Sequence, residues 1–90
     1  MNRLEQLRSD IDKIDVQLIS LFEKRMDISQ EIAEYKENNG LCIYDESREK
    51  QVITKNLENA QEKYRKYIKD FIFCVMKISK DVQQSELEKR

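Results

Sequence analysis

The chain has 90 residues, enough for one domain but not for a catalytic domain with a separate regulatory domain. Charged and apolar residues each make up 39% of it, with one glycine and no proline, a composition typical of helical proteins. The net charge of −1 gives no support to binding of nucleic acid or of an anionic membrane. Because the chain has no histidine, a Ser-His or Cys-His nucleophile is excluded within it, and a zinc site is not expected.

The sequence predicts a cytoplasmic location. No apolar run approaches the roughly 20 residues of a membrane span, and the N-terminus has no apolar signal-peptide segment. The two cysteines are therefore expected to be free thiols. Cys74, inside the apolar run FIFCVM, is expected in the core, and Cys42 in a loop.

The first predicted helix runs from about Asn2 to Glu37 and ends at NNG, residues 38–40, which tolerate a left-handed turn. Its apolar stripe, read in alternating steps of three and four residues, has Arg25 as the one exception. The stripe consists of Leu4, Leu7, Ile11, Ile14, Leu18, Leu21, Arg25, Ile28, Ile32 and Tyr35. At about 1.5 Å per residue the helix is more than about 50 Å long, which exceeds the diameter of a compact monomer of this size. A homodimer is the simplest way to bury the stripe.

Two further helices are predicted after the short linker LCIY. Asp45 is expected to cap a second helix that runs to about Asn59. Its inward-facing residues are Val52, Ile53 and Leu57. The third helix runs from about Gln61 to Glu86, and the charged tail SELEKR is expected to fray. The inner face of the third helix consists of Ile68, Ile72, Val75, Ser79 and Gln83, widened by Tyr64, Phe71, Ile78 and Val82.

Two cations of the first helix lie on one face without a local carboxylate. Neither Arg25 nor Lys36 has an acidic residue three or four positions away, and their spacing of eleven residues is three turns plus about 20°. Since a buried unpaired cation is costly, this arrangement favours an anionic ligand. The alternatives are that Arg25 fixes the register of a helical dimer and that Lys36 stabilises the helix C-terminus.

Polar residues also interrupt the other two helices. Asp45, Arg48 and Glu49 share one face at the start of the second helix, where the simpler interpretation is a capped helix with an internal Asp-Arg pair. In the third helix the inner face turns polar at Ser79 and Gln83, which a hydrated helix end also explains.

Taken together, these positions resemble the active-site pattern of the all-α chorismate mutases in order and in near-constant spacing. The matching residues are Arg8, Arg25, Lys36, Asp45, Arg48, Glu49, Ser79 and Gln83. The resemblance extends from about Leu4 to Gln84 and is carried by LRSDIDKIDVQLISLFEKRMDISQEIAEYK, YDESRE and ISKDVQQ. The linker departs from the family in lacking the proline often found before the Tyr-Asp pair.

The resemblance implies an all-α interlocked homodimer, with residues 1–90 as a single helical domain. It implies an isomerase that converts chorismate to prephenate, a Claisen rearrangement in phenylalanine and tyrosine biosynthesis, with no metal or other cofactor. Such an enzyme folds the flexible arm of a dianionic substrate over its ring and stabilises negative charge on the ether oxygen.

By the same resemblance, Arg25 and Arg8 clamp the substrate carboxylates, because planar bidentate donors suit that geometry. Lys36 and Gln83 donate to the ether oxygen, and Lys36 also reaches a carboxylate. Arg8 lies 17 residues before Arg25, about 25 Å along the helix, and is therefore expected to serve the other subunit's site.

Glu49, helped by the backbone near Asp45, is expected to accept a hydrogen bond from the ring hydroxyl. Arg48 and Ser79 complete the polar wall, with Arg48 also ordering the acids around it. Two alternatives stay open at this point. One is an enzyme of the same fold that releases pyruvate from isochorismate, and the other is a non-catalytic helical dimerisation module.

Overall fold

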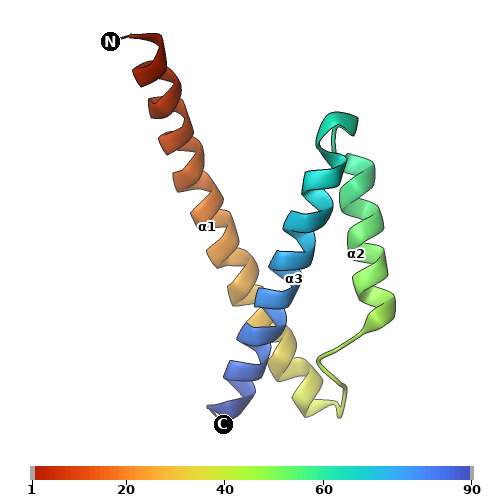
Figure 1. Ribbon diagram of the computed structural model, residues 1–90. Coiled ribbons are helices and arrows are strands. Elements are labelled where there is room, and N and C mark those ends of the chain that lie inside the picture. Colours follow the sequence, from red (N-terminus) through yellow and green to blue (C-terminus); the bar gives the residue numbers. More distant parts are fainter. Residues whose placement is uncertain (1, 90) are drawn as a thin grey trace.

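The computed structural model describes residues 2–89 and is helical almost throughout (Figure 1). It contains α1 (Arg3–Asn38), α2 (Glu46–Asn59), the 3₁₀ turn η1 (Glu62–Tyr64) and α3 (Arg65–Glu88), and no strand among these residues. No helix in this part of the chain combines the length and the apolar character that a membrane crossing requires.

Both ends of α1 have the residues that helix termini prefer. Asn2 forms a capping box with Glu5, whose backbone N–H donates to the Asn2 side chain over 2.8 Å. At the other end Asn39 is the C-cap and Gly40 follows with φ of 65°, a left-handed conformation that glycine adopts without strain. The predicted ending at NNG is confirmed.

The second half of the chain differs in detail from the prediction. Asp45 caps α2 as expected, and α2 ends at Asn59. α3, however, begins at Arg65 after the separate turn η1, and it continues to Glu88. The expectation that SELEKR frays was therefore wrong for its first four residues, Ser85–Glu88, which form the last turn of α3.

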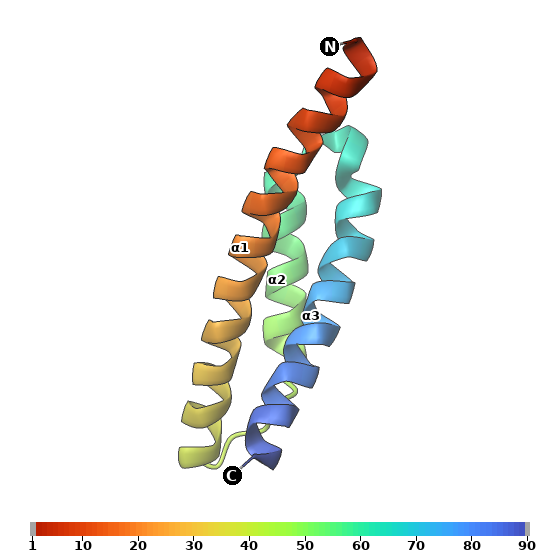
Figure 2. The same cartoon turned by 90° about the vertical axis from the view of Figure 1, so that its left-hand side faces the viewer.

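α3 packs against both other helices and carries most of the core (Figures 1 and 2). The central cluster consists of Val52 from α2 with Ile72 and Met76 from α3, and Ile53 and Ile68 pack against it. Where α1 crosses α3, Ala33 is fully buried. The core is thus small and lies between α2 and α3.

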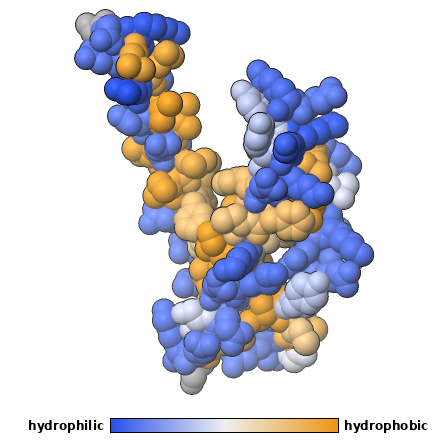
Figure 3. Space-filling view, in the orientation of Figure 1, coloured by the Kyte–Doolittle hydropathy of each residue, from blue (hydrophilic) through white to orange (hydrophobic). Residues whose placement is uncertain are grey.

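The N-terminal half of α1 stands clear of the other helices (Figure 1). Its apolar stripe is exposed: Leu7, Ile14 and Leu21 keep 42%, 57% and 64% of their surface. Figure 3 shows hydrophobic side chains along this arm. The radius of gyration is 16.5 Å, against about 12 Å for a compact domain of this length. The described residues of one chain therefore leave most of the stripe uncovered.

Cys74 does not lie in the core, contrary to the prediction, and both cysteines are exposed free thiols. The run FIFCVM is apolar on all sides, so its hydropathy does not tell which face of the helix is buried. The structure buries Ile72, Val75 and Met76 and leaves Phe71, Phe73 and Cys74 exposed.

Candidate active site

A cavity of about 270 Å³ lies where α1, the linker, α2 and α3 meet. Its polar and charged lining residues are Arg25, Ser29, Lys36, Asp45, Arg48, Glu49, Ser79, Lys80 and Gln83. Its apolar lining residues are Ile28, Ile32, Ile43, Val52 and Met76. The cavity is thus lined by charged, polar and apolar side chains together. Its volume lies just below the range of about 300–1,000 Å³ that is typical of ligand sites.

Seven of the eight residues predicted for the site line this one cavity, although they come from three helices and span residues 25–83. The eighth, Arg8, does not line it; Arg8 lies on the exposed arm of α1. Arg8 therefore does not meet the other seven residues within one chain, and its place in another subunit's site stays a prediction.

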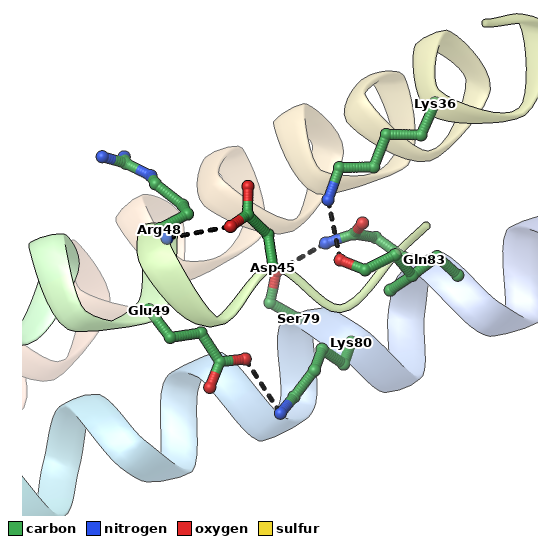
Figure 4. Close-up of polar contacts among 8 residues, drawn as sticks. Lys36, Asp45, Arg48, Glu49, Ser79, Lys80 and Gln83 are labelled. Atoms are coloured by element: carbon green, nitrogen blue, oxygen red, sulfur yellow. Dashed lines mark hydrogen bonds and ion pairs between the residues drawn. The ribbon is translucent and has the colours of Figure 1, made fainter. Parts of the chain in front are cut away.

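The α1 side of the cavity supplies two cations. Arg25 is half-buried, and its guanidinium has no carboxylate partner among residues 2–89. Lys36 donates from Nζ to the backbone carbonyl of Ile43 over 2.7 Å (Figure 4). That bond ties the linker to α1 and uses one of the three N–H groups of the ammonium, so two remain for a ligand.

The first turn of α2 forms the opposite wall. The Asp45 carboxylate accepts from the backbone N–H of Arg48 over 3.0 Å, and this cap fixes where the helix starts. One turn of helix from this cap then places Arg48 and Glu49 at the cavity.

The internal Asp-Arg pair considered from the sequence is absent, because Asp45 bonds the backbone of Arg48 and not its guanidinium. Among the described residues the Arg48 guanidinium forms no ion pair with Asp45 or Glu49, and its ordering of these acids stays a prediction. Glu49 instead pairs with Lys80 of α3, whose Nζ lies 2.9 Å from Glu49 Oε2 (Figure 4).

α1 and α3 together form a buried chain of hydroxyl and amide groups. Ser29, Ser79 and Gln83 are each at most 8% exposed. Gln83 Nε2 donates to Ser79 Oγ over 3.3 Å, and the oxygens of Ser79 and Ser29 are 2.6 Å apart. Because the Ser29 hydroxyl donates to the carbonyl of Arg25, Ser79 must donate to Ser29 and accept from Gln83.

This chain of donors fixes the Gln83 amide. One N–H is used by Ser79, while the second N–H stays available, and Gln83 Oε1 is buried with no partner among the described residues. A buried amide oxygen without a partner is costly. The Gln83 end of the cavity is therefore prepared for a polar ligand group.

The charges of the cavity match a small dianion. Four cationic side chains, Arg25, Lys36, Arg48 and Lys80, face two anionic ones, Asp45 and Glu49, so the lining has an excess of two positive charges. Arginine and lysine donors inside an aliphatic wall bind carboxylates and stabilise developing negative charge.

Sequence reasoning missed two polar residues of the site, Ser29 and Lys80. Ser29 lies four residues after Arg25 and is small, so it looks like filler beside the stripe, and its partner Ser79 is 50 residues away. Lys80 follows Ser79, so helical periodicity points it about 100° off the inner face. Only the packing of α2 on α3 brings it to Glu49.

Comparisons with known proteins identify the family of the chain. A family model described as chorismate mutase type II matches residues 7–84, so the chain belongs to that family. The predicted family and the all-α fold class are thereby confirmed.

The chain is also similar to individual proteins. The T-protein of Haemophilus influenzae is 43% identical over 49 residues, 54% of this chain and 13% of that protein. A bifunctional chorismate mutase/prephenate dehydratase of Aquifex aeolicus is 33% identical over 64 residues, 71% of this chain and 18% of that protein. The match thus spans less than a fifth of either relative. A solved structure of a conserved hypothetical protein from Pyrococcus furiosus is 37% identical with a TM-score of 0.73, and the match covers 92% of this chain and 97% of that one.

Proposed function

We propose that the chain is a chorismate mutase, which converts chorismate to prephenate by an intramolecular Claisen rearrangement. The observation that carries the proposal is the convergence of seven family-pattern residues on one cavity with two excess positive charges. The substrate is a dianion, and the rearrangement needs its enolpyruvyl arm folded over the ring. A rigid, charge-matched pocket meets that need by holding the reactive conformation.

The α1 face and Gln83 act on the reacting atoms. Arg25 binds one substrate carboxylate through two parallel N–H groups. As the C–O bond breaks, the ether oxygen gains negative charge, and Lys36 and Gln83 donate hydrogen bonds to it. Both donors are already oriented, Lys36 by the Ile43 carbonyl and Gln83 by Ser79, so little reorganisation accompanies the step.

The α2 face binds the ring. Glu49 accepts from the ring hydroxyl, and the capped N-terminus of α2 beside Asp45 offers backbone dipoles to the same region. Arg48 and Ser79 close the polar wall. No protein group has to gain or lose a proton for this chemistry.

The proposal includes a homodimer, supported by the exposed stripe of α1. Leu4, Leu7, Ile11, Ile14, Leu18 and Leu21 are each 42% to 64% exposed and share one helix face. A second, antiparallel copy of α1 covers this face and brings the partner subunit's Arg8 to the cavity, where it binds the second carboxylate. A cytoplasmic location, which the free thiols of Cys42 and Cys74 suit, belongs to the same proposal.

The test is incubation of the purified protein with chorismate, with the products identified. Loss of chorismate absorbance with formation of prephenate is expected, and Arg25→Ala should be nearly inactive. Salicylate and pyruvate formed from isochorismate, without prephenate from chorismate, would point to the lyase chemistry of the same fold. No turnover of either compound by a folded protein would leave the non-catalytic helical module.

A further inference from the structure

Lys80 of α3 makes an ion pair unlike the others described along the chain. Its Nζ lies 2.9 Å from Glu49 Oε2 across the interface between α2 and α3, and the two side chains are only 37% and 24% exposed. By contrast, the pairs Lys50–Glu46 and Lys77–Asp81 each join residues four apart on one helix, with every side chain at least 66% exposed. Exposed pairs of that kind contribute little, whereas partial burial strengthens the attraction between Lys80 and Glu49.

We propose that Lys80 is a positioning residue for the reaction, which acts by holding the carboxylate of Glu49. This inference rests on the proposed function, in which Glu49 accepts from the substrate's ring hydroxyl. Glu49 has three rotatable side-chain bonds, and the ion pair fixes one end of its carboxylate. Oε2 is held by Lys80, and Oε1 keeps its full capacity to accept from the hydroxyl (Figure 4).

Lys80 also balances charge in the cavity. The other charged side chains of the lining are Arg25 and Lys36 from α1, Asp45 at the cap of α2, and Arg48 on α2. Removing Lys80 lowers the excess of positive charge from two to one while a dianion has to bind. The anionic Glu49 then faces the substrate carboxylates without its own counter-ion.

Lys80 has a second contact that ties it to the same wall. Its Nζ lies 5.3 Å from the centre of the Tyr44 ring, a cation–π contact with the residue just before the α2 cap. Lys80 therefore holds the linker from the α3 side, and Lys36 holds it from the α1 side through Ile43. The long reach of a lysine places its charge between Tyr44 and Glu49 without bringing it into the centre of the cavity.

The test compares kcat/KM for Lys80→Met, Lys80→Gln and Lys80→Arg with the wild type. Loss of a charge-assisted bond to a part-buried carboxylate is expected to lower kcat/KM about tenfold in the first two variants. Lys80→Arg, which keeps the charge, should recover most of that loss. Lys77→Met is the matched control, because it removes a lysine of the same helix from an exposed ion pair, and it should keep the wild-type kcat/KM.

A double-mutant cycle with Glu49→Gln separates positioning from other roles. If Lys80 acts through Glu49, adding Lys80→Met to Glu49→Gln should reduce kcat/KM no further than Glu49→Gln alone. Losses that multiply, in variants whose melting temperatures match the wild type, would overturn the positioning role and assign Lys80 an independent one. Absence of chorismate turnover by the wild type is a different result, which contradicts the proposed function itself.

Discussion

The N-terminal and C-terminal halves of α1 differ in how much of their surface the rest of the chain buries. Among residues 3–24, where the stripe is entirely apolar, no residue is buried. Beyond this point the helix buries Met26, Ser29 and Ala33, and there it also carries the two cations Arg25 and Lys36. Only the C-terminal half is partly covered by another helix, and even there the stripe residues Ile28, Ile32 and Tyr35 stay 42% to 64% exposed. A stripe on a helix thus indicates that something packs there, but not whether the partner is the same chain, a second chain or a ligand.

The exposed arm and the covered half of α1 contribute to stability in different ways. Covering a half-exposed Leu or Ile stabilises by about 1 kcal/mol, so the six aliphatic stripe residues of the free arm offer several kcal/mol to a partner helix. In the covered half, Arg25 occupies a stripe position that is apolar elsewhere along the helix. Its side chain lines the cavity and supplies a cation there. We therefore expect substitutions in the arm to act through assembly and substitutions in the covered half to act on catalysis directly.

The largest effect is expected for Ile14→Glu in the middle of the arm. A charge buried in an apolar interface of two copies should weaken dimerisation more than about 100-fold and abolish activity at both sites. Val16→Glu makes a similar change on the opposite face, where Val16 is 72% exposed, and should leave both properties intact. Sedimentation with activity assays measures this. A fully active monomer of Ile14→Glu would show that the arm has no role in catalysis.

The next largest effect concerns Gln83 in the covered half. Gln83→Ala removes a donor to the ether oxygen and should lower kcat/KM by about 100-fold to 1,000-fold at every pH. Gln83→Glu donates only when protonated, and an unperturbed glutamate has a pKa of about 4.3. Burial raises the pKa of the introduced carboxyl, and Arg25 and Lys36 lower it. Activity should therefore fall as pH rises through the pKa of this new group, which leaves an acid optimum that the wild type lacks. A pH profile of Gln83→Glu identical to that of the wild type would exclude contact with the ether oxygen.

A smaller effect is expected at Ser29, which reaches the reaction only through Ser79 and Gln83. Ser29→Ala removes the acceptor of the Ser79 proton, so Ser79 no longer sets the orientation of the Gln83 amide. The loss of one neutral hydrogen bond should lower kcat/KM about three- to tenfold. Ser20→Ala, on the exposed part of the same helix, is the control. An unchanged kcat/KM in Ser29→Ala would mean that Ser79 alone orients Gln83.

Local signals in the sequence predicted the elements well, because caps and breakers act within a few residues. The NNG ending of α1 and the Asp45 cap of α2 depend only on neighbouring backbone groups. Seven of the eight residues of the ordered family pattern line the cavity, and Arg8 does not. Features set by packing between helices were not predictable in this way. Lys80 reaches Glu49 only because α2 lies on α3, and Cys74 is exposed because one side of FIFCVM faces neither helix.

The central claim is that one active site takes its cavity from one chain and Arg8 from another. It is tested most directly by mixing Arg8→Ala and Arg25→Ala subunits under conditions that allow exchange. Each variant alone should be nearly inactive, because every site in its dimer lacks one arginine. In the heterodimer one pocket has both arginines and the other has neither. An equal mixture should therefore recover about a quarter of the wild-type activity per site. If mass spectrometry confirms exchange and activity stays at the level of the single variants, the shared site is contradicted.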